Sequence, residues 1–162
     1  MYSVSFTGHR PEKLPYFSED DPMFIDMKQR LKAQIEKLID EGADGFFSGM
    51  ARGVDIWSAE IIIELKSKYP GLKLTAVIPC RTQTSNWDED SVIRYNNILK
   101  QCDKAIYISD EYNKTCMLKR DRALVDMCDV LVAVFDGTKG GTKYTVDYAE
   151  KKHKKIIVIP PM

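Results

Sequence analysis

Short apolar runs alternate along the chain with segments of helical periodicity. Runs such as "YSVSFT" and "DVLVAVFD" are rich in β-branched and aromatic residues, which favours buried strands. Between them, residues such as Met27, Leu31, Ile35 and Leu38 recur at helical spacing among charged residues. The pattern predicts strands at residues 2–7, 45–48, 72–79, 104–109, 129–136 and 155–161.

The predicted helices fill the intervals between these strands. The first contains residues 27–39 and ends near Gly42, and the others cover 52–69, 87–101, part of 110–128, and 143–153. Strands separated by helices run parallel, and right-handed crossovers place helices on both faces of their sheet. We therefore expect a Rossmann-like, doubly wound, mainly parallel α/β sheet in a single domain over residues 1–162.

Composition narrows the class of protein. The 162 residues include 24 basic and 24 acidic side chains, and this zero net charge argues against nucleic acid as a partner. No apolar stretch is long enough for a membrane helix, and "MYSVSFTGHR" does not resemble a signal peptide, so we expect a cytoplasmic protein without a membrane partner. The four cysteines form no CxxC pair and predict neither a metal site nor a disulfide framework. The sequence does not decide the oligomeric state, and a homo-oligomer is one alternative.

The loops that follow the strands differ in character from those that precede them. "TGHRP", "SGMARGVD", "PCRTQTSNW", "SDEYNKT" and "FDGTKGGT" hold most of the glycines and several unusual polar residues. In open α/β sheets, ligands bind beyond the carboxyl ends of the strands, where these loops lie. The sequence therefore predicts a ligand site at this edge.

"SGMARGVD" has two readings. Gly49 and Gly53 would let the backbone approach a phosphate at a helix N-terminus, Arg52 would bind the phosphate, and Asp55 would accept from ribose hydroxyls. Alternatively, the segment is a tight turn in which Asp55 is an N-terminal helix charge. The spacing matches neither a Walker loop nor the G-x-G-x-x-G fingerprint.

"FDGTKGGT" joins the clearest buried strand to a helix. Its paired glycines would form a backbone nest for phosphate, with the Thr142 hydroxyl as a further donor, or the loop is only flexible.

Single polar or aromatic residues in the other loops add candidates. His9 and Arg10 would face the crevice, as would Arg120, while Trp87 would stack on a base or anchor packing. The candidate ligand-binding residues are Gly8, His9, Arg10, Ser48, Gly49, Met50, Arg52, Gly53, Asp55, Pro79, Trp87, Arg120, Asp136, Gly137, Gly140, Gly141 and Thr142.

Taken together, "TGHRP", "SGMARGVDIWSAE" and "MLKRDRALVDMCDVLVAVFDG…GGT" resemble the YpsA-like branch of the SLOG superfamily. That superfamily joins the DNA-processing protein DprA and the LOG phosphoribohydrolases, and the resemblance covers nearly the whole chain. It implies a Rossmann-like sheet that binds a nucleotide or a nucleotide-derived molecule.

The resemblance to the LOG enzymes breaks at one position. Arg120 matches their helical arginine and Gly141-Thr142 matches the "GT" of their glycine loop, but Thr145 stands at the glutamate position. A threonine cannot supply the charge or base that such a hydrolysis needs at neutral pH. If the protein is an enzyme, Arg120 and Asp136 are the candidate catalytic residues, with Asp55 or Glu60 as substitute carboxylates.

Three functions follow from these observations. The first is a protein that senses, carries or sequesters a nucleotide-derived molecule, such as one related to NAD or ADP-ribose, with no further cofactor and no metal. The alternatives are a nucleotide N-glycosidase and a DprA-like module that binds single-stranded DNA.

Overall fold

A six-stranded, all-parallel sheet forms the centre of the protein in the computed structural model, which describes residues 1–162. The strand order is β4-β3-β2-β1-β5-β6. The strands are β1 (Tyr2–Gly8), β2 (Ala43–Ser48), β3 (Lys73–Cys80), β4 (Lys104–Ser109), β5 (Val130–Val134) and β6 (Lys155–Ile159).

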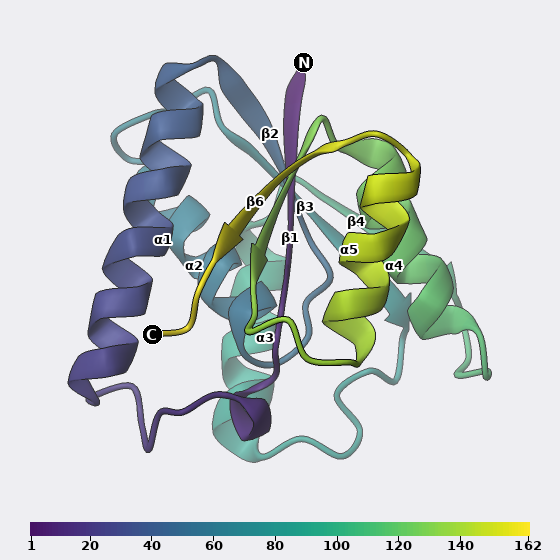
Figure 1. Cartoon of the computed structure of the whole chain (residues 1–162). Coiled ribbons are helices and arrows are strands. Elements are labelled where there is room, and N and C mark those ends of the chain that lie inside the picture. The colour runs from purple at the N-terminus through teal and green to yellow at the C-terminus, as the bar shows by residue number, and fades with distance from the viewer.

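Five α-helices connect the strands and cover both faces of the sheet. Figure 1 shows α1 on one side of the sheet, with α4 and α5 together on the other; α2 packs against α1 and α3. No helix combines the length and apolar character that a bilayer-spanning segment needs. The helices are α1 (Pro22–Asp40), α2 (Val54–Leu65), α3 (Glu89–Gln101), α4 (Cys116–Met127) and α5 (Gly141–Lys151). The expected Rossmann-like α/β fold is confirmed.

The direction of winding reverses between β1 and β5. The chain builds outward from β1 to β4, then crosses through α4 to place β5 on the free side of β1. The backbone N–H of His9 donates to the Val134 carbonyl at 3.2 Å, so the two strands stay paired up to their carboxyl ends. The loops after β1 and β5 therefore leave the sheet next to each other, at the place where such folds bind ligands.

Alternate residues of β5 face the two layers of helices. Val130, Val132 and Val134 belong to the larger core cluster, beneath α1 and α2. Leu131 and Ala133 belong to a smaller cluster with residues of α4 and α5. Burial on both faces explains why this strand reads as a continuous apolar run.

Two helices start later than the sequence pattern predicts. Helix α2 begins at Val54, because Gly53 has φ of 92°, a conformation outside the helical region. It also ends earlier, at Leu65. Helix α3 begins at Glu89, because the carboxylate of Asp88 accepts a first-turn N–H and caps the helix there.

Candidate functional site

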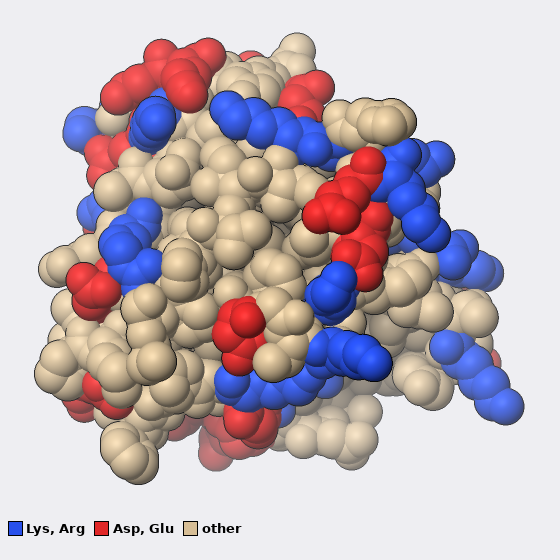
Figure 2. Space-filling view, in the orientation of Figure 1, with Lys and Arg blue, Asp and Glu red and all other residues tan.

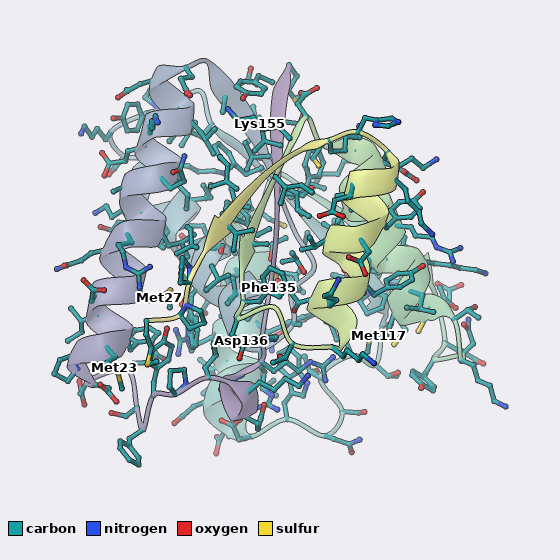
Figure 3. All side chains as sticks on the ribbon, viewed as in Figure 1. Met23, Met27, Met117, Phe135, Asp136 and Lys155 are labelled. Atoms are coloured by element: carbon teal, nitrogen blue, oxygen red, sulfur yellow. The ribbon has the colours of Figure 1, made fainter.

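A cavity of about 340 Å³ opens at the carboxyl edge of the sheet, beside the switch point. Its walls come from the loop after β1, the turn before α2, one face of α4 and the start of α5. Figure 3 shows the labelled Met117 of α4, which lines the cavity, at the same end of the molecule as Asp136, which follows β5. The volume falls within the range of roughly 300–1,000 Å³ that is usual for small-molecule sites.

Arg120 of α4 forms part of the inner wall, with only 6% of its side chain exposed. Its Nη1 donates to the Gly49 carbonyl at 2.5 Å, and its Nε donates to the Asp121 carboxylate at 2.7 Å. The Gly49 carbonyl also accepts from Gln83 Nε2 at 3.1 Å. These bonds hold the guanidinium in place and tie α4 to the turn after β2.

Asp55 lines the same wall and is 6% exposed. Its Oδ2 accepts from the Ala51 N–H at 3.3 Å, and its backbone carbonyl accepts from the Ser48 hydroxyl at 2.9 Å. Burial raises the pKa of the Asp55 carboxyl to about 6, against the opposing charge of Arg120. Asp55 is therefore mostly ionised at neutral pH, although it is buried.

Asp121 is a second carboxylate in the cavity, partly buried, and the sequence did not single it out. Its side chain is 14% exposed, and burial raises its pKa, while Arg120 and the Thr145 hydroxyl act in the opposite direction. Thr145 is itself buried and donates to the Gly141 carbonyl at 2.9 Å. The inner wall thus combines two carboxylates with one guanidinium.

Outside this wall, polar contacts join the loop after β1 to the loop after β5. His9 is 3% exposed, and its Nε2 lies 2.9 Å from Asp136 Oδ1. Hydrogen bonds from Thr138 and His9 hold the pKa of the Asp136 carboxyl well below its usual range. Lys13 Nζ donates to the Lys139 carbonyl at 3.0 Å, which adds a second link between the two loops.

The glycines of "SGMARGVD" make room for neighbouring groups. A Cβ on Gly49 would lie 2.9 Å from both Arg120 and Asp55, and one on Gly53 would lie 2.7 Å from the carbonyl oxygen of His9. Gly8, at the end of β1, has the same role, because a Cβ there would overlap the Val54 side chain. The geometry therefore favours the tight-turn reading of this segment.

The cavity gathers fewer than half of the predicted site residues. The lining residues foreseen from sequence are Gly8, His9, Arg10, Asp55, Arg120, Gly141 and Thr142. Further lining residues, which the sequence did not indicate, are Thr7, Glu12, Lys13, Ala51, Met117, Leu118, Asp121 and Leu124.

The remaining candidates lie outside the cavity. Arg52 pairs with Glu12 at 2.5 Å and lines a separate cavity of about 70 Å³, while Trp87 packs edge-to-face on Tyr95. Asp136 lines a second cavity of about 490 Å³, which shares Glu12 and Lys13 with the first. The other candidates outside the cavity are Ser48, Gly49, Met50, Gly53, Pro79, Gly137 and Gly140.

Of the two substitute carboxylates predicted from the sequence, Asp55 and Glu60, one lines the cavity and the other does not. Glu60 forms an ion pair with Arg94 at 2.5 Å and does not line the cavity, whereas Asp55 does. No group of three or more His, Cys, Asp or Glu side chains is arranged to hold a metal ion.

Replacing Asp55 by Asn is expected to change how stability depends on pH. Folding raises the pKa of Asp55 from its ordinary 3.8 to about 6, so between these values the folded state binds more protons than the unfolded chain. The contribution of Asp55 to the free energy of unfolding therefore increases as pH falls. Between pH 8 and pH 5, the free energy of unfolding of the wild type should rise by about 1 kcal/mol relative to that of Asp55→Asn. Urea unfolding of both proteins at the two pH values measures this difference, and a constant difference would contradict it.

An all-parallel sheet with a polar cavity at its switch point defines a Rossmann-like α/β protein. The chain belongs to the YspA SLOG family, whose profile matches residues 4–159. This confirms the resemblance to the YpsA-like branch that the glycine motifs indicated.

Curated relatives and solved structures agree with this placement. The chain is 32% identical to a UPF0398 protein of Bacillus cereus strain G9842 and 31% identical to one of Bacillus thuringiensis strain Al Hakam, in each case over 94% of this chain and 84% of the relative. DNA processing protein A of Helicobacter pylori superposes with a TM-score of 0.66 at 21% identity, and that of Streptococcus pneumoniae with 0.65 at 15%. Both cover 97% of this chain, which spans 64% and 50% of theirs.

Proposed function

We propose that the protein binds a small phosphorylated nucleoside in the switch-point cavity, as a sensor, carrier or sequestering protein. The observation that carries the proposal is the polarity of this cavity. The cationic side chains of Arg10 and Lys13 and the first residues of α5 line it, together with the carboxylates of Asp55 and Asp121.

The start of α5 is suited to a phosphate. Gly140 is its N-cap and offers no side chain to the first turn, while Gly141 and Thr142 line the cavity. The first N–H groups of a helix lack partners within the helix and carry its positive dipole end, so they favour an anion. The sequence pattern predicts that this helix begins two residues later, at Lys143, and leaves Gly141 and Thr142 in a loop.

Two cations complete this end of the cavity. Arg10 is exposed and forms no ion pair, and Lys13 is held near the start of α5 by its bond to the Lys139 carbonyl. Figure 2 shows a row of Lys and Arg side chains across the lower part of this face, where the sheet's carboxyl edge lies, with acidic side chains above and below it and further basic side chains elsewhere on the face. A phosphate there would meet both donors and positive charge.

Removing Arg10 is expected to weaken binding of phosphorylated ligands. A hydrogen bond to a charged group contributes about 1.5–3 kcal/mol, so Arg10→Ala should raise the Kd for AMP or ADP-ribose at least tenfold. Arg81→Ala is the matched control, because Arg81 lies at the same edge of the sheet, pairs with Asp110 and lies outside the cavity. Isothermal titration calorimetry compares the three proteins, and equal effects of the two substitutions would contradict the assignment.

Asp121 favours a second candidate function, hydrolysis of a nucleotide N-glycosidic bond. It puts a carboxylate beside Thr145 and Arg120, although residue 145 itself carries none. Release of free base from AMP, abolished in Asp121→Asn, would support this function, and no turnover across a panel of nucleotides would dismiss it.

The Helicobacter pylori relative by fold is described as binding single-stranded DNA. At 21% identity the likeness extends to the fold, and the zero net charge of this chain does not favour a polyanion. A gel shift at low salt tests this alternative.

The four cysteines support a reducing compartment. All four are free thiols, and three are buried. We accordingly propose that the protein is cytoplasmic. Because one sheet runs through the whole chain, we also propose that residues 1–162 form a single domain.

A further inference from the structure

The inner wall of the cavity holds a carboxylate oxygen to which no protein group donates. Asp55 accepts one hydrogen bond, at Oδ2 from Ala51, and no protein group donates to its Oδ1. The residue is 6% exposed and its exposed part lies in the cavity. Oδ1 is not among the fully enclosed polar atoms, so it is accessible from the cavity, where a ligand can supply the donor that the protein does not.

Asp121 offers a second acceptor on the same wall, from α4. One of its oxygens accepts from Arg120 Nε at 2.7 Å. Arg120 also donates to the Gly49 carbonyl, and its charge lowers the pKa values of both Asp55 and Asp121.

The charge on this wall selects the chemistry of what it can bind. Two carboxylates and one guanidinium leave a net negative charge when all are ionised, so a phosphate would be repelled. A cationic group would meet Arg120, and also Arg10, which acts electrostatically on both carboxylates. Neutral groups with several donors fit best, and adjacent hydroxyls of a sugar are such groups.

We propose that Asp55 and Asp121 bind the 2′- and 3′-hydroxyls of the ligand's ribose, and that the site therefore selects ribonucleotides over deoxyribonucleotides. The inference rests on the proposed function, because the phosphate at the start of α5 sets which end of the ligand faces this wall. The ligand enters with its phosphate outermost and its ribose against α4.

The test compares matched ligands on the wild-type protein by isothermal titration calorimetry. AMP should bind at least tenfold more tightly than 2′-deoxy-AMP and 3′-deoxy-AMP, because each deoxy ligand lacks one of the two donors and leaves a carboxylate oxygen of the cavity wall unpaired. If AMP binds and the deoxy ligands bind equally well, the inference is wrong and the proposed function stands. If AMP, NAD and ADP-ribose all fail to bind, both are wrong.

A pair of variants on α4 then assigns the preference to its residue. Asp121→Asn should reduce the preference for AMP to less than about threefold, chiefly by weakening AMP binding. Asp126→Asn is the control, because Asp126 is exposed on the same helix and accepts from Tyr148. An unchanged preference in a folded Asp121→Asn protein, checked by circular dichroism, would exclude Asp121 from the ribose site.

Discussion

Arg120→Ala is expected to destabilise the protein by about 3–5 kcal/mol, the cost usual for breaking a buried ion pair by removing one partner. The substitution would leave Asp55 and Asp121 buried without their shared counter-charge, and the Gly49 carbonyl would lose one of its two donors. For a chain of this length the midpoint of thermal unfolding should fall by roughly 10 °C. Thermal unfolding at pH 7.5 measures the change.

The neighbouring arginine provides the control for this prediction. Arg122 is exposed, and its Nε donates to the Tyr144 hydroxyl at 2.6 Å. Arg122→Ala should shift the midpoint by no more than about 2 °C, as is usual for exposed positions. If both variants unfold at the same temperature, Arg120 does not hold the inner wall together.

Gly53→Ala is expected to destabilise the protein by about 2–3 kcal/mol, because it combines backbone strain with overpacking. Gly53 has φ of 92°, which residues with a side chain rarely adopt, and its Cβ would lie 2.7 Å from the His9 carbonyl oxygen. If the His9 segment moves to relieve this contact, His9 shifts away from Asp136 and the bond between the loops after β1 and β5 is lost. Ligand affinity should therefore fall together with stability.

Gly71→Ala separates these effects from the general cost of replacing a glycine. Gly71 lacks a positive φ, and no atom lies within 4 Å of the Cβ that the substitution adds. Urea unfolding should show a change within about 0.5 kcal/mol for this variant. A similarly mild effect of Gly53→Ala would show that the turn before α2 can relax, and would contradict the packing role of its glycine.

The alternation of apolar runs and helical segments was enough to predict the class of fold. Each strand of the parallel sheet is an apolar run or is bounded by turn residues. Its position and length can therefore be recognised from neighbouring residues in the sequence. The position of the switch point was not visible in this way. It depends on β5 pairing with β1, whose contacts join residues more than a hundred positions apart, such as Val4 and Val130.

The site was only partly predictable, because residue type and loop position say little about which way a side chain points. Gly49 and Gly53 carry a recognisable motif, but neither lines the cavity, and an added Cβ would meet Arg120 and Asp55 at Gly49 and the His9 carbonyl at Gly53. On α4, the cavity is lined by Met117, Leu118, Arg120, Asp121 and Leu124. Four of these follow the helical spacing i, i+3, i+4 and i+7 from Met117.

That spacing was a usable signal for the missed carboxylate. It places Asp121 on the same face of α4 as Arg120 and leaves Arg122 on another face. The segment before α5 was predicted to form a phosphate nest, but its glycines give no clear starting residue for the helix. Only the backbone conformation of Gly140, with φ of 147°, fixes where the first turn begins.

The central claim is that a phosphorylated nucleoside binds in the cavity between β1, α4 and α5. Titration of the ¹⁵N-labelled wild-type protein with AMP, NAD and ADP-ribose, followed by amide NMR, tests it most directly. We predict saturable shifts for at least one ligand, largest at the amides of Gly8, Arg10, Gly141 and Thr142. The absence of shifts at millimolar ligand, or shifts centred on Trp87 and Arg81 instead, would contradict the account.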